Sequence, residues 1–339
     1  MYDLVFVTHI PAFYKINLYN EIAKKKNIFV VFISENTAEV RTNDFVPLDN
    51  ALFDFTVLNL DAFQSRNKIK SCYALMKYLN RLTYKRIVVS GWDLPEFWLV
   101  VAWANKSKIS LALESTINES KVTGLAGFIK KIFLARVSLV FASGKLHNDL
   151  LSALNYAGET RITNGVGIIN KPQFVLSEKK YSKRFLFIGR LSEEKNIIQL
   201  VSLFNDLPNY QLTIIGTGPL REKLKKSALN NTKILGNIDN KKLPAYYLAN
   251  DFLILPSARE PWGLVVEESL YFGTPVVVAE QCGSSELIIN GQNGFIFDST
   301  NFDSLKDLLI AINLERYDEI KSFNLSIKNK DLKQVSCYE

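Results

Sequence analysis

Short apolar runs alternate with segments of helical periodicity along most of the chain. The first half opens with the apolar run LVFVTH, the helical segment NLYNEIAKK and the apolar run IFVVFIS. Further along, RIVVSG and ISLALES enclose another helical segment. Strand-like apolar runs separated by helices are typical of a parallel sheet with helices on both faces. The pattern therefore predicts a doubly wound α/β domain.

The same order restarts after a polar stretch, which we interpret as a linker near residues 168–182. The second half contains the strand-like runs RFLFIG, QLTIIG, DFLILPS and TPVVVAE. We predict two tandem Rossmann-like domains, over residues 1–168 and 169–315. The last residues, 316–339, are polar and helical, and we expect them to pack back on the first domain.

The loops after the strands are the expected place for chemistry. In open parallel sheets, ligands bind beyond the carboxyl ends of the strands. The cleft between the two predicted domains is therefore the expected active site.

Composition narrows the class of protein. Hydrophobic residues make up 47% of the chain and charged residues 22%, which argues against disorder. The three cysteines are scattered, as expected for reduced thiols rather than a zinc site or a disulfide framework. The first residues lack the features of a signal peptide, and no apolar run reaches the roughly 20 residues of a membrane span. We expect a cytoplasmic protein.

The net charge of +7 favours acidic partners. Basic residues interleaved with apolar ones cluster at Lys121, Lys130, Lys131, Arg136 and Lys145. A solvated surface helix is the simpler interpretation, and a face that rests on an anionic membrane is the alternative. Because no nucleic-acid-binding motif accompanies these residues, we do not expect a nucleic acid partner.

Two carboxylates stand on a fixed spacing between two strand-like runs. Glu260 precedes a predicted helix that opens near Gly263, and Glu268 lies inside that helix. The four-residue helical step places Leu264, Glu268 and Phe272 on one face, so Glu268 should face inward and need a partner. Ribose hydroxyls are suitable donors, and amides at the helix N-terminus favour phosphate.

The segment AREPWGLVVEESLYFGTPVVV resembles the signature of the retaining, GT-B-fold nucleotide-sugar transferases of glycosyltransferase family 4. The resemblance implies that Glu260 contacts the donor sugar near the reacting carbon and that Glu268 holds the nucleotide ribose. It also implies that the loop Pro261-Trp262-Gly263-Leu264 lays backbone amides against the diphosphate. We interpret the neighbouring Glu267 as solvated.

The segment GRLSEEKN, residues 189–196, looks like the phosphate-binding turn of the same family. Carried over to this chain, Gly189 belongs to the turn, and Arg190 and Lys195 neutralise the departing diphosphate, as Mg²⁺ does in metal-dependent transferases. The resemblance thus implies catalysis without a metal or another cofactor. A surface loop with two ordinary cations is the alternative.

Further segments resemble the family in the expected order, and together the matches cover residues 183–312. The run IIGTGPLREKL resembles the glycine turn beside the nucleotide base and contributes Gly216. The run QCGSSELIINGQNGFIF resembles the closing turn and strand of the domain, with Ser284, Ser285 and Glu286 along the donor loop.

Candidates for acceptor binding lie in the first half, where the resemblance is fainter. His9 follows the first strand, where many relatives have paired glycines, and HIPAFYKINLYNEI looks like the opening of bacterial polysaccharide-assembly members. Asp93 and Glu114 follow two later strands and are candidates for a general base or a partner of sugar hydroxyls. A structural role for His9, and helix capping by Asp93 or Glu114, are the alternatives.

We therefore predict a hexosyltransferase that uses a nucleotide diphosphate sugar, either a UDP- or a GDP-sugar. The acceptor implied by the resemblance is a glycan or a lipid-linked intermediate of bacterial cell-surface polysaccharide synthesis, including lipopolysaccharide. Three alternatives stay open. A nucleotide-sugar 2-epimerase shares the architecture, a non-catalytic subunit would bind a sugar nucleotide without turnover, and a glycoside hydrolase would also use paired carboxylates.

Overall fold

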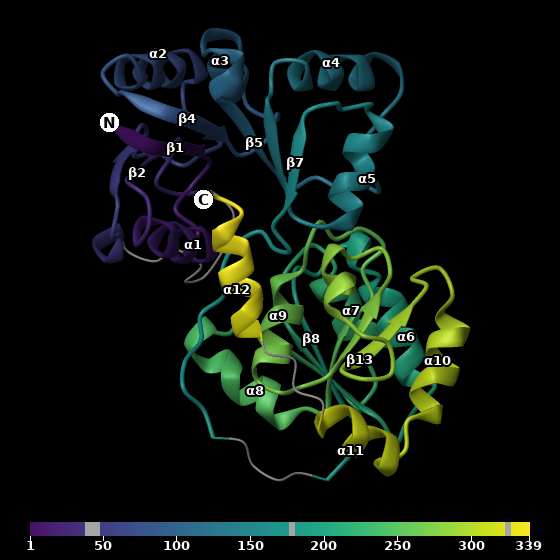
Figure 1. The fold of residues 1–339 in the computed structure, drawn as a ribbon. Coiled ribbons are helices and arrows are strands. Elements are labelled where there is room, and N and C mark those ends of the chain that lie inside the picture. Colours follow the sequence, from purple (N-terminus) through teal and green to yellow (C-terminus); the bar gives the residue numbers. More distant parts are fainter. Residues whose placement is uncertain (38–47, 176–179, 323–326) are drawn as a thin grey trace. The chain divides into compact units, whose positions relative to one another are not determined.

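The computed structural model describes residues 1–37, 48–175, 180–322 and 327–339. The chain divides into two compact units, the first formed by residues 1–170 with 329–339 and the second by residues 171–328. Each unit is a parallel sheet with helices on both faces (Figure 1). The prediction of two Rossmann-like α/β domains is confirmed.

The first unit contains a seven-stranded sheet in the order β3-β2-β1-β4-β5-β6-β7, with every neighbouring pair parallel. Its strands are β1 (Tyr2–Thr8), β2 (Ile28–Phe32), β3 (Asp54–Val57), β4 (Tyr84–Val89), β5 (Ile109–Leu113), β6 (Leu139–Ala142) and β7 (Glu159–Ile162). Its helices are α1 (Phe13–Ala23), α2 (Lys68–Leu79), α3 (Pro95–Trp103), α4 (Gly124–Leu134) and α5 (Lys145–Ala153).

Both faces of this sheet are buried, which explains why its strands are apolar throughout. Side chains alternate across a strand, so Val5 and Val7 pack with α2, α3, α4 and α5 on one face. Leu4 and Phe6 pack with α1 on the other face.

The end of the chain also covers that second face, through α12 (Ile327–Ser336) and the residues after it. Tyr338 stacks on Phe141 with ring centroids 4.3 Å apart. By contrast, α11 (Leu314–Ser322) buries Tyr317 and Ile320 in the core of the second unit. The segment 316–339, which the sequence analysis treats as one element, is therefore divided between the two units.

The second unit contains a six-stranded parallel sheet in the order β10-β9-β8-β11-β12-β13. Its strands are β8 (Arg184–Ile188), β9 (Gln211–Ile215), β10 (Thr232–Gly236), β11 (Phe252–Leu255), β12 (Val276–Ala279) and β13 (Gly294–Phe297). Its other helices are α6 (Ile197–Asn205), α7 (Arg221–Ser227), α8 (Leu243–Ala249), α9 (Leu264–Tyr271) and α10 (Phe302–Ala311).

Each sheet has one point where the strand order reverses. The reversal lies between β1 and β4 in the first unit and between β8 and β11 in the second. The two loops that leave such a pair of strands turn to opposite sides of the sheet and open a crevice between them. These two positions are therefore the places to look for sites.

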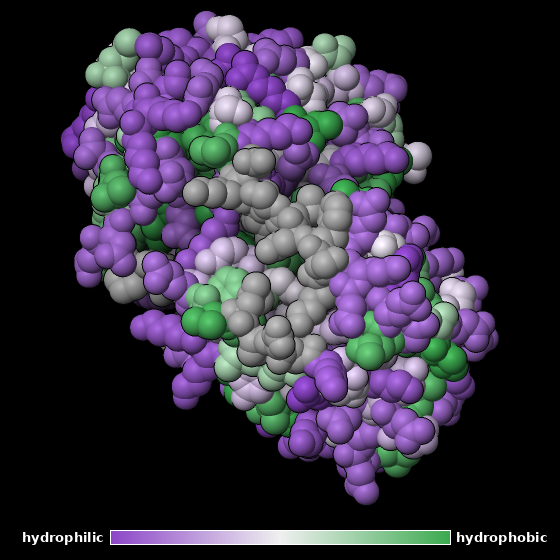
Figure 2. Space-filling view, turned by 60° about the horizontal axis from the view of Figure 1, so that its bottom comes forward, coloured by the Kyte–Doolittle hydropathy of each residue, from purple (hydrophilic) through white to green (hydrophobic). Residues whose placement is uncertain are grey.

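The surface carries no extended apolar area on the face shown in Figure 2, where hydrophobic residues appear in small, separate patches. In the part of the chain that the structure describes, every helix is too short or too polar to cross a membrane.

Candidate functional site

A lysine and a glutamate meet at the strand reversal of the second unit. Lys195 follows β8 and Glu260 follows β11, and the Lys195 Nζ and the Glu260 Oε2 form an ion pair. The two side chains are only 14% and 15% exposed. The fold thus unites two predicted site residues that are far apart in the sequence.

Backbone contacts hold the two loops together. Lys195 ends a short 3₁₀ turn, and Asn196 after it adopts a left-handed conformation with φ of 51°. The Asn196 side-chain amide donates to the carbonyl of Pro256, 3.0 Å away, and the amide of Ala258 donates to the carbonyl of Glu194. Lys195 is therefore held in place by the loop that delivers Glu260.

Gly216 has a packing role at the edge of this site. It follows β9, has φ of +139°, and a Cβ there would lie 1.9 Å from the carbonyl oxygen of Gly189. The loops after β8 and β9 are thus in direct backbone contact, which only glycine permits at position 216. At Gly189 a Cβ would make ordinary contact with the ring of Phe187.

The loop after Glu260 leads into the N-terminus of α9. Gly263 precedes this helix with φ of +98°, and no side chain caps it. A Cβ at Gly263 would lie 3.1 Å from Ser284 Oγ and 3.3 Å from Glu260 Cγ. Leu264 opens the helix and is partly exposed. The uncapped amides beside Glu260 are suited to an anion.

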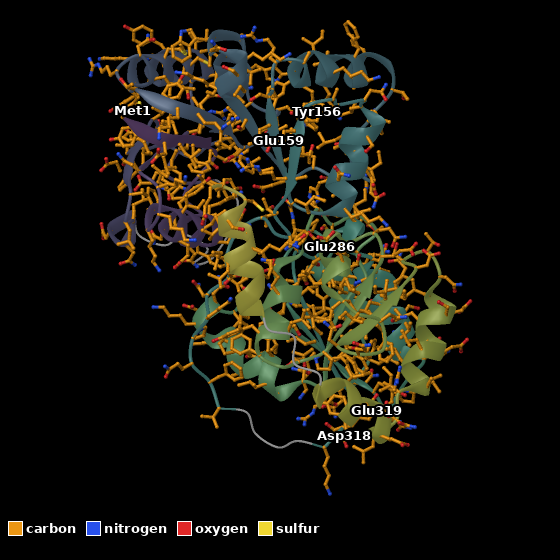
Figure 3. All side chains as sticks on the ribbon, viewed as in Figure 1. Met1, Tyr156, Glu159, Glu286, Asp318 and Glu319 are labelled. Carbon is orange, nitrogen blue, oxygen red and sulfur yellow. The ribbon has the colours of Figure 1, made fainter. Side chains whose placement is uncertain are left out.

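Ser284 and Glu286 lie in the turn after β12. Ser284 is fully buried, and its hydroxyl has no hydrogen-bond partner among the described residues. Glu286, labelled in Figure 3, is exposed, and Ser285 is partly exposed. Of these three residues, Ser284 is therefore the one that places a buried polar atom next to the loop of Gly263.

The two neighbouring glutamates of α9 have different partners. Glu268 is partly buried, and its Oε2 accepts a hydrogen bond of 2.6 Å from the Tyr247 hydroxyl. Burial and the Glu268 carboxylate raise the pKa of Tyr247 well above its usual value, so the phenol stays a donor. Glu267 is fully buried and accepts from the indole nitrogen of Trp262.

The prediction that Glu267 is solvated is therefore wrong. The face of α9 opposite Glu268 packs into the unit, and the Trp262 indole supplies the partner that a buried carboxylate requires. Because Trp262 as a whole is only 2% exposed, its indole acts within the protein as the partner of Glu267.

Arg190 is the exposed cation of the site. Its guanidinium makes no ion pair with any described residue. The hydrogen bond from Ser192 and the positive charges of Lys195 and Arg190 lower the pKa of Glu194, although burial opposes this shift. The site therefore holds one cation already paired with a carboxylate, Lys195, and one available for an anionic ligand.

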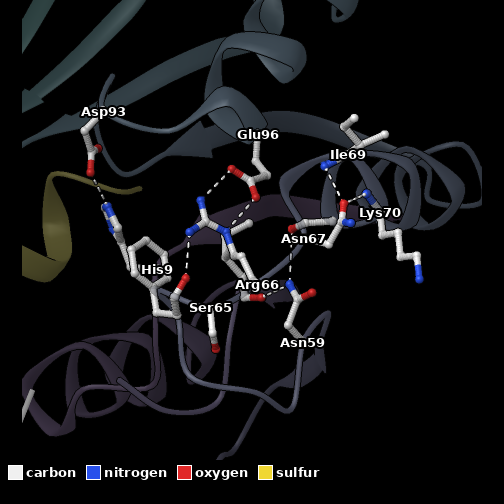
Figure 4. Close-up of polar contacts among 12 residues, drawn as sticks. His9, Asn59, Ser65, Arg66, Asn67, Ile69, Lys70, Asp93 and Glu96 are labelled. Atoms are coloured by element: carbon white, nitrogen blue, oxygen red, sulfur yellow. Dashed lines mark hydrogen bonds and ion pairs between the residues drawn. The ribbon is translucent and has the colours of Figure 1, made fainter. Parts of the chain in front are cut away.

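A second acid–base pair occupies the strand reversal of the first unit. His9 follows β1 and Asp93 follows β4, and their side chains are 2.9 Å apart (Figure 4). Burial opposes ionisation of Asp93, but the hydrogen bond and charge of His9 prevail and lower its pKa. The two acceptor-side candidates are therefore joined.

Glu114 pairs with Lys15, a residue of α1 that sequence reasoning missed. Burial alone would lower the pKa of Lys15, but the Glu114 carboxylate reverses the effect and raises it. Glu114 and Lys15 line a pocket of about 220 Å³ together with His9, Tyr14 and Phe63. A lysine within an otherwise apolar helical face is the signal that could have revealed Lys15, since such a residue needs a carboxylate partner.

Among the described residues, no three His, Cys, Asp or Glu side chains are grouped so that they could hold a metal ion.

Residues 169–324 match the model of the family of glycosyl transferases group 1. The matched residues cover nearly all of the second unit and include its Lys195–Glu260 pair. The chain is 31% identical over 168 residues to glycogen synthase of Mycobacterium tuberculosis, covering 46% of this chain and 41% of that protein. It thus spans about two fifths of the length of this curated relative.

Solved structures of the same architecture match over nearly the whole chain. The lipopolysaccharide outer core galactosyltransferase WaaB, in its apo form, gives a TM-score of 0.70 at 15% identity and covers 98% of this chain and 99% of that one. Anabaena HepE in complex with UDP-glucose gives a TM-score of 0.70 at 15% identity, with coverage of 100% and 97%. At this identity the likeness establishes the GT-B fold.

Proposed function

We propose that this protein is a retaining, metal-independent glycosyltransferase of family 4. It would transfer a hexosyl group from a nucleotide diphosphate sugar to a glycan or a lipid-linked acceptor in cell-surface polysaccharide synthesis. The observation that carries the proposal is the Lys195–Glu260 pair beside Arg190 and the uncapped N-terminus of α9, within the unit that matches the glycosyltransferase family.

The second unit binds the donor in this proposal. Arg190, Lys195 and the first amides of α9 receive the diphosphate, because two cations and a helix N-terminus stabilise phosphate oxygens. Glu268, whose Oε2 accepts from the Tyr247 hydroxyl, also accepts from the ribose hydroxyls in this proposal. Glu260 contacts the sugar, and the donor supplies a partner for the buried Ser284 hydroxyl, which has none among the described residues.

The reaction exchanges one bond to the anomeric carbon for another. The bond from this carbon to the diphosphate oxygen breaks, and its electron pair stays on the diphosphate, where Arg190 and Lys195 offset the growing charge. The acceptor hydroxyl forms the new bond from the same face, and its proton passes to the departing diphosphate. Configuration is therefore retained.

The first unit binds the acceptor in this proposal. Its pocket combines the aromatic rings of Tyr14 and Phe63 with the polar groups of His9 and Glu114, a combination suited to a sugar. The names of two structural neighbours guide the choice of donors to test. One is a lipopolysaccharide galactosyltransferase, and another was solved with UDP-glucose, so UDP-sugars are the first donors to test.

The test is a transfer assay with the full chain. UDP-, GDP- and ADP-sugars are first screened by thermal shift, since a bound ligand stabilises the folded state. The stabilising donor is then incubated with octyl glycosides as acceptor probes, and NMR of the product reads the anomeric configuration. Inversion would refute the retaining mechanism, and conversion of the donor without an acceptor would identify a 2-epimerase.

Variants connect the activity to the site. Arg190→Ala should lower the transfer rate by about 10²-fold, because the guanidinium stabilises charge that grows as the diphosphate departs. Lys225→Ala removes an exposed cation of the same unit and is the matched control. Equal rates for wild type and Arg190→Ala would contradict the proposed role, and donor binding without turnover would indicate a non-catalytic subunit.

A further inference from the structure

Helix α4 of the first unit is apolar on two opposite faces. Gly127, Phe133 and Leu134 are buried against the unit. The outward face carries Leu125, Phe128, Ile129 and Ile132, which are 74%, 61%, 41% and 49% exposed. These four residues follow the i, i+3, i+4, i+7 spacing of a single helical face, and we call them the α4 outer stripe.

Contact with water is unfavourable for the apolar side chains of the α4 outer stripe. Single exposed apolar residues are ordinary on a soluble protein, but four on one face of a three-turn helix form a continuous apolar strip. The core does not require them either, because the opposite face already anchors the helix. We therefore expect the stripe to be covered by an apolar surface outside the unit.

The surroundings of the stripe are basic. Residues 121–136 include Lys121, Lys130, Lys131 and Arg136 and contain no acidic residue. Lys121 and Lys131 are exposed. Lys130 folds back, donating to the Lys121 carbonyl and lying over the ring of Trp92.

The other charged groups nearby are already engaged. Arg136 donates to the carbonyls of Val101 and Ala104, which leaves its charge at the surface but its position fixed. The acid nearest to this segment in the sequence is Glu119, whose carboxylate accepts from the amide of Thr116. Lys121 and Lys131 are thus the cations best placed to meet an anionic surface.

The charge around the α4 outer stripe distinguishes among three surfaces that could cover it: a second copy of the chain, a partner protein and a lipid membrane. In a symmetric pairing of two copies, the same patch meets itself, so the lysines of one copy would approach those of the other. Partner proteins are a poorer match because protein interfaces are depleted of lysine. An anionic lipid surface satisfies both features, since it offers an apolar interior below negatively charged headgroups.

We propose that the α4 outer stripe rests on an anionic membrane surface, with Leu125 and Phe128 inserted among the acyl chains and Lys121 and Lys131 at the headgroups. An 11-residue helix is about 16 Å long, so it lies in the interface rather than spanning the bilayer. The proposal rests on the surface of α4 and of the segment just before it, and it stands whether or not the chain is a transferase.

The experiment is sedimentation of the full chain with vesicles. Vesicles of equal parts phosphatidylglycerol and phosphatidylcholine are compared with phosphatidylcholine alone, each at about 0.05 M and 0.5 M salt to vary screening. We expect binding to the anionic vesicles that weakens at high salt. Equal binding to both vesicle types, or none to the anionic ones, would overturn the proposal.

Two pairs of substitutions locate the contact. Leu125→Ser with Phe128→Ser should lower partitioning at least about tenfold, because two large apolar side chains no longer enter the bilayer. Leu229→Ser with Ile310→Ser changes two similarly exposed residues of the second unit, 56% and 54% exposed, and should leave partitioning unchanged. Circular dichroism and thermal unfolding verify that both variants fold.

The charged part of the contact has its own variant. Lys121→Glu with Lys131→Glu should abolish the preference for anionic vesicles while leaving the fold intact, because both side chains are exposed. Unchanged binding by the Leu125→Ser, Phe128→Ser protein or by the Lys121→Glu, Lys131→Glu protein would refute the α4 contact. Loss of a dimer in the Leu125→Ser, Phe128→Ser protein, without vesicle binding by the wild type, would instead identify self-association.

Discussion

The two units use one sheet topology to build two different sites. In each, the loops after the first and fourth strands face each other across the strand reversal, and each places a basic side chain against a carboxylate. The pair is His9–Asp93 in the first unit and Lys195–Glu260 in the second. The scaffold thus fixes where a pair forms, and the loops decide which groups form it.

The two pairs differ in exposure and in neighbours. The side chains of His9 and Asp93 are 32% and 57% exposed, so water screens their interaction, whereas Lys195 and Glu260 are largely enclosed. The second site adds Arg190 and a helix N-terminus, which suit a diphosphate, while the first adds aromatic rings and Lys15–Glu114, which suit a neutral, hydroxyl-rich ligand. Positive charge is therefore concentrated where a leaving group would need it.

The largest effect should come from the buried acids that support the two sites. Glu96 of the first unit is fully buried and accepts two hydrogen bonds, of 2.9 and 3.0 Å, from Arg66 (Figure 4). Arg66→Met leaves this carboxylate without a cation and should cost about 3–5 kcal/mol of unfolding free energy. Trp262→Phe removes the indole hydrogen bond to the buried Glu267 and should cost about 1–3 kcal/mol.

Urea unfolding followed by hydrogen exchange measures each unit separately. The loss from Arg66→Met should be confined to peptides of the first unit, and that from Trp262→Phe to peptides of the second. Arg161→Met, which removes a partly exposed arginine of the first unit, is the control for the loss of a guanidinium. A uniform loss across both units would contradict their independence.

Next in size is the effect of removing each cation on the reaction. Lys195→Met should lower kcat by about 10²-fold or more, because the lysine stabilises charge that appears only in the transition state. His9→Ala should instead raise KM for the acceptor by about tenfold and leave KM for the donor unchanged, which corresponds to one lost hydrogen bond. Steady-state kinetics with each substrate varied in turn distinguishes the effect on kcat from the effect on KM. A higher KM for the donor in His9→Ala would contradict the assignment of His9 to the acceptor.

The parallel sheets were predictable because their strands are buried on both faces. A strand such as β1 places apolar side chains on both sides, so the sequence shows a continuous apolar run that few other structures produce. The position of the candidate side chains just after the strands was predictable for the same reason, since parallel strands end at a common edge. The division of residues 316–339 between units was not, because it depends on the contacts of Tyr317 and Tyr338 with distant parts of the chain.

The pairing of side chains was less predictable than their position. Lys15 and Glu114 are 99 positions apart, and only the sheet order brings the start of α1 next to the end of β5. Glu267 was wrongly predicted to be solvated. The helical periodicity places it on a different face from Glu268 but does not show which residues cover that face. There the covering group is Trp262, from the loop before the helix.

Acid should destabilise the first unit more than the second, because both histidines belong to the first. His147 is buried, and burial lowers its pKa to about 4, partly opposed by Glu114. Between pH 6.5 and 4 the unfolded chain binds a proton that the folded chain does not, so stability falls as the pH falls. The loss at pH 4.5 should be about 2 kcal/mol relative to pH 7.5.

The measurement is the pH dependence of unfolding, resolved by unit through hydrogen exchange. His147→Gln should flatten the slope between pH 6.5 and 4.5 in the first unit, whatever its effect on absolute stability. His9→Gln, at a more exposed position, is the matched control and should retain the slope. An unchanged slope in His147→Gln would exclude this histidine as its origin.

The smallest effect should come from Tyr247, which contacts no ligand in the proposed reaction but holds one oxygen of Glu268. Tyr247→Phe removes that hydrogen bond while keeping the ring, which stacks on Phe272 at 5.4 Å. Because Glu268 would grip the ribose equally in the ground and transition states, KM for the donor should rise about fivefold, about 1 kcal/mol, with kcat unchanged. Tyr246→Phe on the same helix is the control. A fall in kcat would instead mean that Tyr247 acts on the reacting end of the donor. Helix α8, which carries Tyr247, would then belong to the proposed donor site of the second unit.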